Sequence, residues 1–77
     1  KQLVKLDLYP NPTTGKVNIC TSSDADYITV FNSVGKLVYK IKAEENMELD
    51  LSQFSKGVYL VQVQSAKGIT TERLVVR

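Results

Sequence analysis

The stretch GVYLVQVQ, residues 57–64, decides the fold class of this chain. Tyr59, Val61 and Val63 fall on one side of an extended backbone, and Gln62 and Gln64 fall on the other. Successive side chains of a β-strand point to opposite faces, so this alternation predicts a strand with one buried and one solvated face.

The same period of two recurs along nearly the whole sequence. The apolar sets are Val4, Leu6 and Leu8; Val17 and Ile19; Ile28 and Val30; Leu37, Tyr39 and Ile41; Met47, Leu49 and Leu51; and Leu74 with Val76. In the fourth set, Val38 is the one apolar residue expected on the polar face. About seven short strands at a spacing of roughly 8–12 residues predict an all-β, antiparallel β-sandwich.

Turn residues separate these strands. Asn32–Gly35 and Ser65–Gly68 are predicted as hairpin turns in which the final glycine adopts a positive φ. Residues 50–57 form a longer corner, whose Phe54 is expected to close one end of the core. The final strand is expected to hold the chain end in the sheet.

The aromatic residues divide into two groups. Alternation places Tyr39 and Tyr59 on apolar faces, where core packing is expected. Tyr27 and Phe31 lie on the face opposite Ile28, where they could cover a second small cluster or meet a ligand.

Length and composition limit the function. The 77 residues allow one domain, and residues 1–77 begin abruptly, as a domain at the end of a longer precursor would. The net charge of +2 comes from 10 basic and 8 acidic residues without a basic run, which argues against nucleic-acid binding. No apolar stretch approaches the roughly 20 residues of a membrane-spanning helix, so no membrane span is expected.

The residues of common catalytic sites are missing. The sequence has no histidine, which excludes the usual Ser-His-Asp and Cys-His nucleophiles, and it has a single cysteine. Asp24 and Asp26 have a spacing compatible with two calcium ligands, but the loop lacks the other acidic positions of such a site, and a solvated loop is expected. Cys20 is expected as a half-exposed strand residue. We therefore predict no enzyme, no metal and no cofactor.

Both prolines of the chain lie in LYPNPTTG, residues 8–15. Proline fixes its φ and lacks a backbone donor, so Pro10 and Pro12 are expected in a stiff corner between two strands. The corner has two interpretations. It could be purely architectural, or it could be a recognition site that loses little entropy on docking.

Four segments in order resemble a known family: YPNPTTGKVNI (9–19), VFNSVGKLV (30–38), LDLSQFSKGVYLVQV (49–63) and GITTERLVVR (68–77). Together they are similar to the C-terminal sorting domain of the type IX (Por) secretion system of Bacteroidota. The resemblance implies an immunoglobulin-like β-sandwich. Its motif positions fall here on Pro10, Asn11, Pro12, Gly15, Gly35, Leu37, Gly57, Tyr59, Gly68, Leu74, Val75, Val76 and Arg77.

The resemblance also implies a function. Such a domain is a non-catalytic label that follows a cargo domain, passes through the periplasm, and directs the cargo through the outer-membrane translocon to the cell surface or the medium. A cell-surface sortase then removes it, so the implied partners are the translocon, the sortase and the N-terminally fused cargo. The terminal strand is a second candidate for recognition, as an edge strand that adds to a receptor's sheet. The alternative function is a small fibronectin-like adhesive or carbohydrate-binding sandwich, which predicts an exposed aromatic platform.

Overall fold

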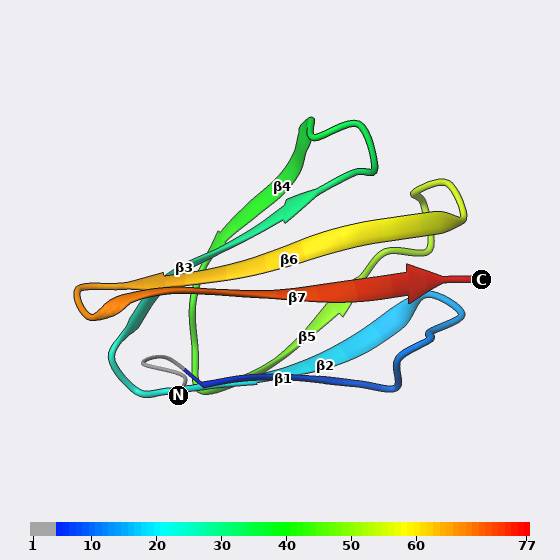
Figure 1. The fold of residues 1–77 in the computed structure, drawn as a ribbon. Helices are drawn as coiled ribbons and strands as arrows, with labels where there is room; N and C mark the ends of the chain where they lie inside the picture. Colours follow the sequence, from blue (N-terminus) through cyan, green and yellow to red (C-terminus); the bar gives the residue numbers. More distant parts are fainter. Residues whose placement is uncertain (1–4) are drawn as a thin grey trace.

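Seven strands and no helix form within residues 5–77, the part of the chain that the computed structural model describes (Figure 1). The strands are β1 (Leu6–Tyr9), β2 (Lys16–Thr21), β3 (Ala25–Phe31), β4 (Leu37–Lys42), β5 (Asn46–Asp50), β6 (Gly57–Ser65) and β7 (Gly68–Val76). Val4, expected at the start of the first buried set, lies outside the described residues. The alternating runs of the sequence are therefore strands, as predicted.

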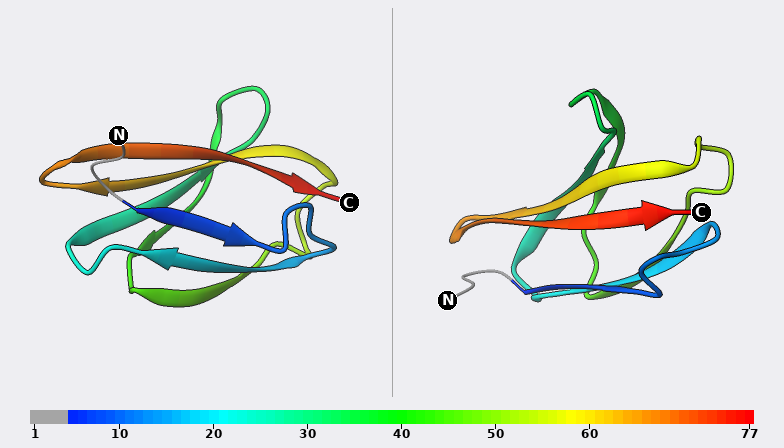
Figure 2. Two further views of the ribbon diagram at one scale, coloured as in Figure 1. Left: turned by 60° about the horizontal axis from the view of Figure 1, so that its bottom comes forward. Right: turned by 45° about the vertical axis from the view of Figure 1, so that its right-hand side comes forward.

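The strands make two antiparallel sheets that lie face to face (Figures 1 and 2). One sheet has three strands in the order β1-β2-β5, and the other has four in the order β4-β3-β6-β7. The chain pairs β1 with β2, β3 with β4 and β6 with β7 inside one sheet, and it crosses between the layers after β2, β4 and β5, as in an immunoglobulin-like sandwich. The predicted fold class is confirmed.

The core lies between the two sheets and consists of the residues that alternation selected. The buried apolar side chains are Leu6, Val17, Ile19, Ile28, Val30, Leu49, Leu51, Tyr59, Val61, Val63, Leu74 and Val76. Each strand except β4 contributes to this set, which therefore joins both layers. Burial of these side chains is the main stabilising contribution to a domain of this size.

Tyr59 connects the core to the corner between β5 and β6. Its ring is buried, and its hydroxyl donates a hydrogen bond to the backbone carbonyl of Ser55. Phe54 packs beside it, with 6.2 Å between the ring centroids. A tyrosine at this corner that bonds back to the preceding loop is a hallmark of immunoglobulin-like domains. The expected core positions of Tyr59 and Phe54 are confirmed.

Strand β4 departs from the prediction. A register shift opposite Val30 and Phe31 turns Leu37 to the outer face, whereas Val38, expected on the polar face, packs against the core. Tyr39 was expected in the core, but its side chain is 38% exposed. The reason is that β4 lies at the edge of the larger sheet away from β7, the edge strand that β1 of the other layer contacts, so the inward side chains of β4 are only partly covered.

The sandwich has two distinct ends, which we call the corner end and the hairpin end. The corner end holds the β1–β2 loop, the β3–β4 turn, the β5–β6 corner and the end of β7, whereas the hairpin end holds the β6–β7 turn (Figure 1). Gly35 has φ 85° in the β3–β4 turn, and Gly68 has φ 142° in the β6–β7 turn. The positive φ predicted at both turn glycines is confirmed. Lys5 lies at the hairpin end, where its N–H donates to the Ser22 hydroxyl.

Candidate functional site

The β1–β2 loop binds the outer edge of the terminal strand. The side-chain amide of Asn11 donates to the Arg73 carbonyl at 2.8 Å, and its oxygen accepts from the Val75 N–H at 3.1 Å. Pro10 and Pro12, both preceded by cis peptide bonds, flank this asparagine and are exposed. The proline corner and the terminal strand, 62 or more residues apart, are therefore in direct contact.

Thr13 continues the same contact with its backbone. Its N–H donates to the Val75 carbonyl at 2.9 Å, and its carbonyl accepts from the Arg77 N–H at 2.8 Å. This is one step of a parallel ladder, formed by the isolated bridge between Thr13 and Val76. The Asn11 amide extends the ladder by one further step, because it bonds to the carbonyl of one strand residue and to the N–H two residues later. We call residues 11–13 with residues 73–77 the clamp.

The side chain of Thr13 holds the loop in this position. Its hydroxyl donates to the Lys16 carbonyl and accepts from the Gly15 N–H, and the residue is buried. Gly15 in turn lies so close to the β5–β6 corner that an added Cβ would be 3.2 Å from the Ser52 Cβ. Its carbonyl accepts from the Leu51 N–H. This close packing and a φ of 156° both favour glycine here.

Thr13 is the site residue that the sequence analysis did not identify. A threonine two residues before a glycine is typical of turns in which the hydroxyl binds nearby backbone, and this pattern could have marked it. Its long-range partners on the terminal strand could not be inferred from local sequence.

Most of the motif positions meet at the corner end. Gly57 pairs with Val76, Val58 with Val75 and Tyr59 with Leu74, so the third motif lies beside the terminal one. Leu37 pairs with Phe31, which pairs with Leu60, and Gly35 lies in the turn just before β4. Gly68 is separate, because it pairs with Ser65 at the hairpin end. The structure therefore brings together the first, third and terminal motifs, with the second two strands away.

The expectation of an open terminal edge needs revision. Strand β7 does lie at the edge of the larger sheet, and Leu74 and Val76 are buried on one face while Val75 points to the other. However, the clamp already pairs the outward backbone groups of Arg73 and Val75. Addition of another strand at this half of β7 requires displacement of the loop.

The corner end also contains an open pocket. It has a volume of about 350 Å³ and lies between the β3–β4 turn and the β5–β6 corner, lined mainly by Asn32, Val38, Phe54, Lys56 and Tyr59. Lysine is its one ionisable group apart from the hydrogen-bonded Tyr59 hydroxyl. This set contains no histidine and no carboxylate, the commonest general bases.

Other potential chemical sites are weaker. Asp24 forms an ion pair with Lys67, with 3.3 Å between Oδ2 and Nζ. Within residues 5–77 there is no group of three or more possible metal ligands. Hydrogen bonds from the hydroxyl and backbone N–H of Ser52 lower the pKa of Asp50, a fully exposed group at the start of the β5–β6 corner. Cys20 is half-buried on β2, as predicted.

The exposed aromatic side chains do not share one surface. Tyr9 lies on the outer face of the three-stranded sheet, where its strand partner is Asn18. Tyr27 lies on the outer face of the other sheet, and the Lys40 ammonium is 4.7 Å from its ring centroid. Tyr39 occupies the inward side of the β4 edge. The described residues therefore offer no single aromatic platform of the kind expected for a carbohydrate-binding module.

Comparison with known proteins identifies the family to which this chain is similar. The model of the secretion system C-terminal sorting domain matches residues 7–77. The chain is 32% identical over 74 residues to beta-agarase D of Zobellia galactanivorans, covering 94% of the chain and 15% of that protein. It is 32% identical over 66 residues to ulvan lyase NLR42 of Nonlabens ulvanivorans and 37% identical over 65 residues to beta-agarase A of Z. galactanivorans. These matches cover 82% and 78% of the chain and 12% of each of the two proteins.

Residues 5–77 form no helix that is long and apolar enough to cross a membrane.

Proposed function

Because the chain belongs to the C-terminal sorting domains of the type IX secretion system, we propose that its clamp is the surface by which the translocon recognises it. Sorting domains of this family are non-catalytic signals carried by cargo proteins that are exported to the cell surface or secreted. The chain spans only 12–15% of the length of its curated relatives, so any enzymatic activity of the whole protein belongs to a part outside it.

One observation carries the proposal: the first motif and the terminal motif form a single hydrogen-bonded unit. Pro10, Pro12 and Arg77 are exposed on this unit, whereas its backbone is already fixed. A receptor that binds a prearranged surface pays little ordering entropy, which favours tight recognition from few contacts. The receptor would contact the terminal strand and the β1–β2 loop together, and it would not pair with a free strand edge.

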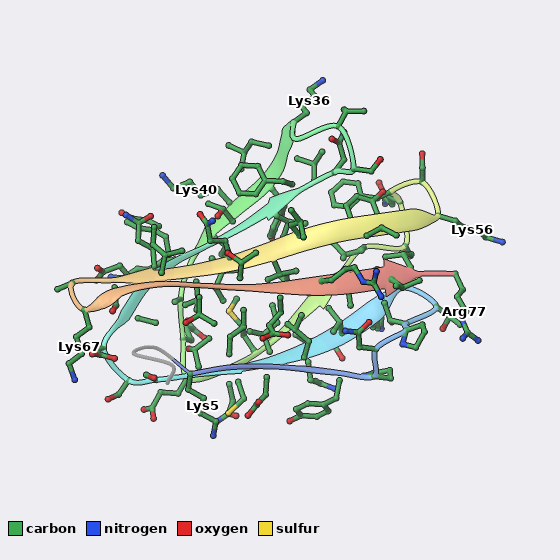
Figure 3. All side chains as sticks on the ribbon, viewed as in Figure 1. Lys5, Lys36, Lys40, Lys56, Lys67 and Arg77 are labelled. Carbon is green, nitrogen blue, oxygen red and sulfur yellow. The ribbon has the colours of Figure 1, made fainter. Side chains whose placement is uncertain are left out.

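The remaining steps follow the biology of the family. Residues 1–77 act as one sorting unit at the end of a longer precursor, with the cargo joined before Lys1. The precursor crosses the periplasm before it meets the translocon, and a cell-surface sortase removes the domain after export. In the folded domain Lys5 lies toward the hairpin end, away from Arg77 of the clamp (Figure 3), which leaves the clamp accessible when cargo is attached.

The test is a reporter protein placed between a signal peptide and this chain, expressed in a type IX-secreting bacterium and in the same strain without its translocon. We expect reporter at the surface or in the medium of the first strain and in the periplasm of the second. Mass spectrometry of the exported reporter should find it without residues 1–77. Periplasmic reporter in both strains would overturn the proposed function.

A further inference from the structure

The outer face of the four-stranded sheet has an apolar region near the corner end, bordered by cationic side chains. Strand register places its side chains in cross-strand rows, and the two rows nearest the corner end contain five apolar residues. These are Phe31, Leu37, Val58, Leu60 and Val75, which we call the apolar patch. In it Leu37 is 47% exposed, Leu60 42% and Val58 40%.

The patch is continuous across four strands. Leu37 on β4 is opposite Phe31 on β3, and Phe31 is opposite Leu60 on β6. Val58 lies two residues from Leu60 on the same face and is opposite Val75 on β7. Side chains directly opposite in antiparallel strands are in contact range. An apolar cluster facing solvent on so small a domain marks an interaction surface more often than isolated exposed residues do.

The charged residues that the strand register places on this face are all cationic, whereas Asp26, exposed in the bulge between Ala25 and Tyr27, has no register position. Lys40 and Lys42 on β4 and Arg73 on β7 occupy its register positions, and none of the register positions described on this face holds a carboxylate. Lys40 and the neighbouring Lys36 project from the β4 side of the molecule (Figure 3). The acidic residues Asp7, Glu48 and Asp50 lie instead on the outer face of the three-stranded sheet.

We propose that this face docks onto a protein surface with an apolar centre bordered by carboxylates, and that this surface belongs to the export machinery. The proposal rests on the proposed function. The apolar patch would fill the apolar centre, and Arg73, Lys40 and Lys42 would face the carboxylates. Complementary charge around an apolar centre orients the two partners and excludes partners of the wrong sign.

A second copy of the chain fits this face poorly. Two copies of the same face would oppose Arg73, Lys40 and Lys42 with cations of their own, which is repulsive. On the outer face of the three-stranded sheet the carboxylates of Asp7, Glu48 and Asp50 outnumber Lys16, but Tyr9 is the one large exposed hydrophobic side chain there among the described residues. It therefore cannot cover five apolar side chains.

The geometry also argues against the cargo as the occupant of this face. The longest dimension of the molecule is 31 Å, and Lys5 is at the hairpin end while the patch is at the corner end. The patch borders the clamp, since Val75 belongs to both. A receptor that contacts the clamp would therefore meet the patch as well.

The test uses the reporter fusion with Leu37→Thr and Leu60→Thr combined. Threonine favours strands, and both side chains are about half-exposed, so thermal melting of the chain should change little. We expect the amount of reporter at the surface to fall about tenfold or more, which is the effect of losing a central apolar contact.

The matched control is Ile69→Thr, which removes a 57% exposed apolar side chain from the same face at the hairpin end and should export normally. Arg73→Glu provides a second, charge-based variant and should also lose export.

The outcomes separate this inference from the proposed function. If the wild-type fusion is exported and both variants are exported equally well, the docking face is wrong and the sorting function stands. If the wild-type fusion is not exported, the sorting function fails and the inference with it. The isolated chain could instead bind phosphatidylglycerol vesicles through Leu37 and Leu60. That result would overturn the proposed protein partner and show that the face binds lipid. A dimer in analytical ultracentrifugation that the double variant abolishes would overturn it in favour of a second copy.

Discussion

Asparagine is well suited to the middle position of the proline corner because its amide presents a donor and an acceptor side by side. Asn11 uses both on the terminal strand, at the Arg73 carbonyl and the Val75 N–H. Aspartate would lack the donor, and an apolar residue would lack both groups. The flanking prolines have no backbone N–H, so at these positions the loop has no main-chain donor to offer the strand edge.

Asn11→Ala tests this role directly. It removes both hydrogen bonds from an exposed edge, where water can replace them, so the free energy of unfolding should fall by only about 1 kcal/mol. Export of the reporter fusion should fall far more, because the loop no longer holds its position on the strand. Asn46→Ala is the control, since Asn46 is exposed on β5, away from the clamp. Normal export of the Asn11 variant would limit the loop to an architectural role.

Thr13→Val replaces a buried hydroxyl by a methyl group of similar size. The Gly15 N–H then loses its acceptor and the Lys16 carbonyl loses its donor in a buried site. We expect the free energy of unfolding to fall by about 1–3 kcal/mol, measured by urea denaturation. Thr71→Val, which removes an exposed hydroxyl bonded to Gln62, should cost less than half as much. If the two substitutions lower the free energy of unfolding equally, the Thr13 hydroxyl does not have the role of holding the β1–β2 loop in position.

Tyr59 allows the hydroxyl and the ring to be tested apart. Tyr59→Phe removes the hydrogen bond to the Ser55 carbonyl and should cost about 1 kcal/mol. Tyr59→Ala also empties a buried volume next to Phe54 and should cost about 3–5 kcal/mol, enough to unfold a marginal domain. Thermal melting of both variants distinguishes the two contributions. A small change for Tyr59→Ala would mean that the ring contributes little to the core.

At the scale of the elements, alternation predicts the strands well where both layers cover them. Val17, Ile19, Val61 and Val63 are completely or almost completely buried, because their strands are central in their sheets. The prediction fails on β4, where a register shift moves Val38 to the core side and an edge position exposes Tyr39. Neither a bulge nor a position in the sheet order can be seen in a period of two.

The clamp could not be predicted for a different reason. The sequence identifies a stiff corner near one end and an apolar strand near the other, and each was a candidate for recognition by itself. Their contact depends on strand order, since β7 must lie at the edge that the β1–β2 loop reaches. Local signals carry no information on contacts between residues 62 or more positions apart.

The last residues of β7 have separable roles in folding and recognition. Deleting Val76 and Arg77 removes one buried side chain and the Arg77 hydrogen bond to Thr13, which should cost about 1–3 kcal/mol and leave a folded domain. Export should nevertheless fail, because one of the four hydrogen bonds of the clamp and its exposed Arg77 are lost. A short acidic tag after Arg77 leaves every contact in place and should also reduce export. Efficient surface delivery of both variants would remove the terminal strand from the recognition surface.

At the scale of the whole molecule, the sandwich is polarised along its length. The corner end contains the clamp, the apolar patch and all motif positions but Gly68, whereas the hairpin end contains the β6–β7 turn and Lys5 (Figures 1 and 2). Gly68 has φ 142° in that turn, so its conformation gives a structural reason for glycine there. Recognition at one end and cargo at the other would let one domain serve cargoes of different size.

Matched insertions test this polarity. Gly-Ser-Gly placed between Ala66 and Lys67 lengthens the turn at the hairpin end, and the same insertion between Ser33 and Val34 lengthens the turn at the corner end. Both sites are exposed hairpin tips, where insertions are tolerated, and by the weak length dependence of loop closure each should cost about 1 kcal/mol or less. The first should export like the wild type, because its turn is remote from the clamp and the patch. The second should export poorly, because the longer turn obstructs a receptor that approaches the patch beside Leu37. Equal export of the two fusions, with equal melting temperatures, would show that recognition is not confined to one end.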